Sequence, residues 1–170
     1  AYQYVERDAD MAVSYYRQSD SVRVAIGDSL ALNRMLPAVA SLYRTMGDLP
    51  TARRYYDRAI AAHERAGDGA RLAVSERNQG VLLSEMGFHS EALGHLTRAR
   101  SIYEEAGNSA DVAPVISWIG VVHRRLGDYD SAVEAYQRAI EIAQEEDNAE
   151  WLADAYNNLG VVLAYADRYD

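Results

Sequence analysis

The chain has 170 residues, of which 49% are hydrophobic, and a formal net charge of −9, so it can fold as one globular domain with a buried core. It contains no cysteine and no lysine, which excludes disulfides, thiolate nucleophiles, a P-loop lysine and a Schiff-base lysine. The acidic balance disfavours nucleic acid and anionic membranes as partners, and no apolar run is long enough to suggest a membrane span. The polar N-terminus does not resemble a signal peptide, so we expect a cytoplasmic protein.

Small residues recur every 40 positions along the chain. Three such series are Gly80, Gly120 and Gly160, with Ala40 in phase; Gly47, Gly87 and Gly127; and Ala12, Ala52, Ala92 and Ala132. A fixed period of 20 to 50 residues indicates one supersecondary unit stacked several times. We therefore expect a single repeat domain over 1–170. Its parts are a partial repeat 1–28, full repeats 29–68, 69–108 and 109–148, and a partial repeat 149–170.

In chain order, the first partial repeat should hold the end of one helix at 1–6 and a second helix at 8–26. Complete helix pairs should follow at 29–66, 69–106 and 109–146. Pro37 falls about nine residues into its helix, where proline removes a hydrogen bond and should kink the chain. A last helix should cover 149–166. Because no polar capping element is visible at either end, we expect a fragment of a longer protein.

The repeat 109–148 shows the pattern most clearly. Apolar residues recur at helical spacing from Val112 to Leu126, and Gly127 should end that helix in the left-handed conformation. A second apolar stripe runs from Tyr129 to Ala143, so each repeat is two helices of about 18 residues. Side-chain caps are expected from Asp128 and from one slot that recurs every 40 residues, namely Asp28, Asp68, Asn108 and Asn148.

The order Ile116, Ile119, Gly120, His123, then Ala132, Tyr136 and Ala139, resembles the tetratricopeptide repeat (TPR) pattern W-x2-L-G-x2-Y, A-x3-F, A. The resemblance covers essentially the whole chain, although the usual unit has 34 residues. It implies an all-α, right-handed superhelical α-solenoid of stacked antiparallel helix pairs. The 40-residue unit is similar to a subclass found in bacterial signalling and transcription regulators and in kinesin light chains.

We expect no enzyme, no catalytic residue, no metal and no cofactor. The four histidines lack any ligand spacing, and His123 sits at a packing or capping position. The sequence contains no G-x-S-x-G, G-x-G-x-x-G or Walker motif. Most tyrosines, such as Tyr56 and Tyr136, fall in repeat columns, so packing accounts for them.

In a TPR stack the first helix of each pair lines the concave face, so the resemblance places the binding residues there. Positions three and two before, and one and four after, the Gly120 column should point into the groove, with Arg34 one turn earlier. The candidates are Arg34, Ser41 and Arg44 in 29–68; Arg77, Asn78 and Val81 in 69–108; Ser117, Trp118, Val121 and Arg124 in 109–148; and Asn157 and Asn158 in 149–170.

This set contains four arginines and no acid, so the partner can carry acidic groups that the planar guanidinium forks would bind. Asparagine amides suit an extended peptide backbone, and Trp118 would supply an apolar anchor. Two blander interpretations remain open. Exposed arginines are often only solvated, and Trp118 could be buried between repeats.

The sequence therefore favours a protein–protein interaction scaffold that binds a peptide or partner-protein segment in its concave groove, within a bacterial signalling protein. One alternative is a regulatory or sensor region of a transcription regulator or histidine kinase. Another is a self-association module that forms homo-oligomers through uncapped repeat ends.

Overall fold

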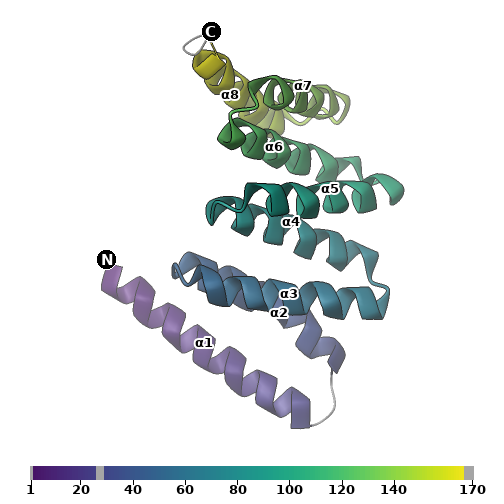
Figure 1. Ribbon diagram of the computed structural model, residues 1–170. Coiled ribbons are helices and arrows are strands. Elements are labelled where there is room, and N and C mark those ends of the chain that lie inside the picture. Colours follow the sequence, from purple (N-terminus) through teal and green to yellow (C-terminus); the bar gives the residue numbers. More distant parts are fainter. Residues whose placement is uncertain (1, 26–28, 167–170) are drawn as a thin grey trace. The chain divides into compact units, whose positions relative to one another are not determined.

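The computed structural model describes residues 2–25 and 29–166, and within them all regular secondary structure is helical (Figure 1). The helices in chain order are α1 (Tyr2–Ala25), α2 (Ser29–Thr45), α3 (Leu49–Ala66), α4 (Gly69–Glu85), α5 (His89–Glu105), α6 (Ser109–Leu126), α7 (Tyr129–Glu145) and α8 (Ala149–Ala166). No helix in these two ranges has the length and apolar character needed to cross a membrane.

The 40-residue period reappears in the places where helices begin. Helices α2, α4, α6 and α8 start at residues 29, 69, 109 and 149, and α3, α5 and α7 start at 49, 89 and 129. From α2 onward each helix has 17 or 18 residues, as the two apolar stripes of the repeat predicted. The spacing of apolar and small residues therefore fixes both the number of helices per repeat and their length.

The N-terminal segment corrects one expectation. We expected a break between helices 1–6 and 8–26, but α1 is one continuous helix of 24 residues. The column that holds Gly47, Gly87 and Gly127 holds Arg7 here, and α1 contains neither glycine nor proline. With no residue suited to the left-handed conformation, nothing in this segment ends the helix.

The turns from residue 47 onward confirm the predicted helix stops. Gly127 has φ 79° and follows the last residue of α6, and its N–H is bonded to the carbonyl groups of Arg124 and His123. Asp147 has φ 50° and is the one non-glycine residue with positive φ in the described chain. It stands in the column of Gly67 and Gly107, so the turn geometry persists where the glycine does not.

Most of the predicted side-chain caps are present. An Oδ1 atom accepts a hydrogen bond from a backbone N–H three residues later at Asp68 (3.1 Å), Asp128 (3.2 Å) and Asn148 (3.1 Å). Asn108 does not cap α6, because its Nδ2 donates to Asp111 Oδ2 at 2.7 Å instead. Asp28 lies outside the described residues. His123 contributes to the α6–α7 junction, with its Nδ1 3.0 Å from Asp128 Oδ2, in line with its expected structural role.

The chain forms two compact units, residues 1–82 and 83–170, and each is described by itself. In the first unit α1 packs on α2, α2 packs on α3, and hydrogen bonds join α3 to α4. In the second unit α5 packs on α6, α6 on α7 and α7 on α8, and α6 also contacts α8 (Figure 1). The single-domain organisation with the repeat boundaries given above stays a prediction.

The packing of α6 on α7 depends on the absence of a side chain at Gly120. A Cβ atom placed there would lie 2.8 Å from Cε1 and 2.9 Å from Cζ of Tyr136, whose side chain is fully buried. Burial also raises the pKa of the Tyr136 phenol above its usual value, because the charged form would lose its hydration. Tyr136 belongs to an apolar cluster with Ala132 and Val162, so the ring connects α6, α7 and α8.

A matched pair of glycine substitutions tests this packing. Gly120→Ala should destabilise the protein by about 1–2 kcal/mol, because overpacking against a buried ring outweighs the better helix propensity of alanine. Gly160→Ala, in the same column, meets nothing within 4 Å and should be neutral or stabilising by up to about 1 kcal/mol. Urea unfolding followed by circular dichroism measures both changes. Equal effects of the two substitutions would contradict the close approach at Gly120.

Candidate functional site

The twelve predicted binding residues all lie on the first helices of the pairs, α2, α4, α6 and α8. Arg34 and Asn157 are exposed, and nine others are half-buried, so they combine a fixed position with surface accessible to a partner. Val81 is the exception, because it is only 5% exposed and presents almost no side-chain surface. Which of these residues contact a partner stays a prediction.

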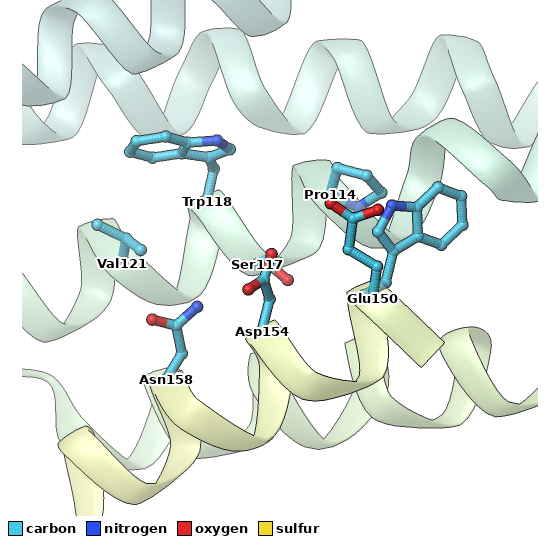
Figure 2. Close-up of a pocket in the computed structure, with 8 residues that line it drawn as sticks. Pro114, Ser117, Trp118, Val121, Glu150, Asp154 and Asn158 are labelled. Atoms are coloured by element: carbon cyan, nitrogen blue, oxygen red, sulfur yellow. The ribbon is translucent and has the colours of Figure 1, made fainter. Parts of the chain in front are cut away.

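In the second unit, α6 and α8 together form a pocket of about 410 Å³. It is lined by Pro114, Ser117, Trp118 and Val121 of α6 and by Glu150, Trp151, Asp154 and Asn158 of α8. Figure 2 shows Glu150, Asp154 and Asn158 extending from α8 and Pro114, Ser117, Trp118 and Val121 from α6. The structure thus brings four predicted residues, Ser117, Trp118, Val121 and Asn158, into one concave site.

The helix packing described above positions both walls of this pocket. Tyr136 holds α6 against α7, and Val162 of α8 joins the same apolar cluster, to which Val121 also packs. The Asn148 cap fixes the start of α8, because its Oδ1 accepts the hydrogen bond from the Trp151 backbone N–H. The indole and carboxylate groups of the first turns of α8 therefore stand on a capped helix end.

Sequence reasoning missed Glu150, Trp151 and Asp154, which supply half of the α8 wall or more. Asp154 lies six residues before Gly160, the same offset that selected Arg34 relative to Ala40. Applied to every repeat, that offset selects Pro114 and Asp154, and both line the pocket. Glu150 and Trp151 lie about one further turn toward the start of α8, where only a search extended along the whole helix would find them.

The pocket has the opposite charge from the one expected. It contains two carboxylates and no arginine, although the predicted set contained four arginines and no acid. Arg124, the arginine of the set nearest in sequence, has its guanidinium carbon 6.0 Å from the centre of the Tyr165 ring and does not line the pocket. Among the described residues, neither Glu150 nor Asp154 forms a salt bridge.

The remaining candidates lie elsewhere on the first helices and do not line this pocket. They are Arg34, Ser41 and Arg44 of α2; Arg77, Asn78 and Val81 of α4; Arg124 of α6; and Asn157 of α8. Across the part of the chain that the structure covers, no three histidine, aspartate or glutamate side chains are grouped in a way that could hold a metal ion.

A scan against family models matches the tetratricopeptide repeat over residues 30–105 and 111–170, which is most of the chain. The chain belongs to the tetratricopeptide repeat family. Among curated protein sequences, none matches it significantly. TPR domains bind other proteins, so the resemblance read from Gly120, Ala132 and Tyr136 is confirmed at the level of family.

Solved structures give the same result for the fold. BtubC (BKLC) from P. vanneervenii is 25% identical, with a TM-score of 0.74 over 98% of this chain and 67% of its own. Aspartyl phosphate phosphatase F from Bacillus subtilis is 16% identical, with a TM-score of 0.85 over 97% of this chain and 43% of its own. A Rap protein complexed with competence and sporulation factor is 20% identical, with a TM-score of 0.78 over 99% and 47%.

These likenesses confirm an all-α fold of stacked helix pairs, as in TPR solenoids. This chain spans less than half the length of the phosphatase and of the Rap protein.

The TPR columns also show where this chain departs from an apolar interior. Helix α4 buries Ser75, Glu76 and Gln79 in the columns that hold Val115, Ile116 and Ile119 in α6. Two of these polar residues bond to α3. His63 Nδ1 and Ser75 Oγ share a hydrogen bond of 3.1 Å, and Gln79 Nε2 donates to Asp57 Oδ1 at 2.8 Å. Gln79 Oε1 is buried with no hydrogen-bond partner among the described residues.

Replacing Gln79 by leucine tests the cost of this arrangement. Gln79→Leu removes a buried carbonyl oxygen without a partner and restores the apolar character of the column, while the exposed Asp57 stays hydrated. We expect stabilisation of about 1 kcal/mol in urea unfolding. The control Gln137→Leu changes an exposed glutamine of α7 and should leave stability unchanged. A loss of stability in Gln79→Leu would show that the bond to Asp57 outweighs the buried carbonyl.

Proposed function

We propose that this chain is a non-catalytic protein-interaction scaffold that binds a peptide or a partner-protein segment along its first helices. The observation that carries the proposal is the pocket between α6 and α8, because four of the predicted residues line it. An open pocket with two indoles, carboxylates and an amide offers both apolar contact and hydrogen bonds, the combination that recurs in peptide and ligand sites.

The proposal extends to a role in bacterial, cytoplasmic signalling. A related fold is that of the Rap protein complexed with competence and sporulation factor, which supports a peptide-like partner here. Another solved structure of similar fold is a signal transduction ATPase described as carrying a tetratricopeptide repeat sensor, 18% identical over 91% of this chain with a TM-score of 0.78. This supports the alternative of a sensor region in a larger regulator. Acidic groups of the partner would meet Arg34, Arg44 and Arg77 on α2 and α4.

A crosslinking experiment tests where the partner binds. A photo-crosslinking amino acid at Ser117, inside the pocket, should capture a partner segment, whereas one at Thr97, exposed on α5, should not. The captured partner, identified by mass spectrometry, should then bind at least tenfold more weakly to the double variant Arg77→Ala/Asn78→Ala. Circular dichroism checks that the variant folds. Capture from Thr97 alone, or unchanged affinity in a folded variant, would contradict the assignment.

A second candidate function, self-association, is favoured by one face of α8. Tyr156 is 51% exposed and Leu163 is 47% exposed, whereas Ile116, the equivalent of Tyr156 in α6, is 5% exposed. An apolar column that α6 buries is therefore open on α8, and such surface can pair with a second copy.

Light scattering after size-exclusion chromatography measures this association. If α8 mediates it, the mass should rise with concentration toward a dimer, and Tyr156→Ser/Leu163→Ser should remain a monomer. Leu126→Ser removes a leucine that is also 47% exposed, on α6, and should leave the association unchanged. A monomer at every concentration of the unaltered protein rules out this candidate.

A further inference from the structure

We propose that the pocket between α6 and α8 binds a basic side chain, arginine or lysine, of the partner segment. The inference rests on the proposed function and deepens it, since it assigns to this pocket a ligand charge opposite to that expected from the arginines of the chain. Its basis is the combination of two carboxylates and both tryptophans of the chain in one pocket.

The carboxylates are available to a ligand. Glu150 and Asp154 stand four residues apart on α8, so both project from one face of the helix into the same pocket. Both side chains are exposed, and neither is engaged in a salt bridge within the described chain. Glu150 also lies in the first turn of α8, where the helix dipole favours the charged form. A guanidinium or ammonium group would therefore meet two negative charges that no arginine of this pocket already neutralises.

The other residues of the wall fit the rest of a long basic side chain. Trp118 and Trp151 offer indole faces, which attract cations more strongly than other aromatic rings do. Pro114 and Val121 present apolar surface on which the methylene stem of arginine or lysine can lie. Ser117 and Asn158 supply further oxygen acceptors for the donors of the charged head. A volume of about 410 Å³ lies at the small end of ligand pockets, which suits insertion of side chains rather than of a folded element.

The charge distribution along the chain favours the same sign of ligand. Residues 87–170 contain 6 arginines and 15 acidic residues and carry the whole net charge of −9, while residues 1–86 are neutral. A field of this kind attracts basic segments and repels acidic ones at long range. The only arginine of α6 in the predicted set, Arg124, lies by the Tyr165 ring and leaves the pocket to the carboxylates.

Tryptophan fluorescence reports on this pocket directly, because both tryptophans of the chain line it. The probe is the acetylated and amidated peptide Gly-Arg-Gly-Gly-Arg-Gly, titrated into the chain at about 0.15 M salt. Two matched peptides carry citrulline or glutamate in place of arginine, so that the first retains the shape without the charge and the second reverses the charge. We expect the arginine peptide to change the fluorescence and to bind at least tenfold more tightly than either control peptide.

The double variant Glu150→Gln/Asp154→Asn should weaken binding of the arginine peptide at least tenfold. The control Asp130→Asn/Glu134→Gln removes the same two charges at the same spacing from exposed positions on α7, outside the pocket, and should weaken binding less than twofold. Circular dichroism confirms that both variants remain helical. Equal weakening by both variants would show a general field effect and overturn the proposal, as would equally tight binding of the citrulline or glutamate peptide.

Failure of this inference is distinguishable from failure of the proposed function. If a partner crosslinks at Ser117 with undiminished affinity in Glu150→Gln/Asp154→Asn, the binding role stands and the basic ligand is wrong. If the arginine peptide behaves as expected but no partner crosslinks at Ser117, the pocket binds a basic group and the scaffold role is wrong.

Discussion

The close approach of α6 to α7 at Gly120 is the contact on which the second unit depends. A hydrogen in place of a methyl group lets the Tyr136 ring pack on the backbone of α6, and the same ring then packs with Val162 of α8. Two first helices are thereby held beside a shared second helix, with their exposed faces next to each other. The pocket exists because this buried contact places α6 and α8 at a fixed separation.

The positions that carry chemistry lie between the positions that repeat. The column of Gly120 and the column of Ala132 keep their small residues along the chain, because packing allows little else there. Six residues before the Gly120 column the chain is free to vary, and it holds Arg34, Val74, Pro114 and Asp154 in successive repeats. Each repeat thus offers a partner a different surface on the same scaffold, which is how one fold can serve different ligands.

The sequence was sufficient to predict the helices and their stops, because these depend on local chemistry that recurs every 40 residues. It failed at Arg7, where the missing glycine should have signalled a continuous helix, and at Asn108, whose amide bonds Asp111 rather than the helix end. It also located half of the pocket. The sign of the pocket's charge escaped prediction, because it depends on where long side chains point. Arg124 turns to Tyr165, and Asp154 of another helix fills the space that it leaves to the ligand.

The polar interior of α4 follows from a problem that repetition creates. Near-identical helix pairs share the same apolar columns, so apolar packing alone distinguishes poorly between a correct neighbour and one displaced by a whole repeat. The bonds from His63 to Ser75 and from Gln79 to Asp57 form only when α3 meets α4 in the native register. In α6 the columns of Ser75 and Gln79 hold valine and isoleucine, so a misplaced α6 would leave His63 without its partner serine in a buried site. Buried hydrogen bonds of this kind contribute less to stability than apolar packing would, and they contribute more to the uniqueness of the pairing.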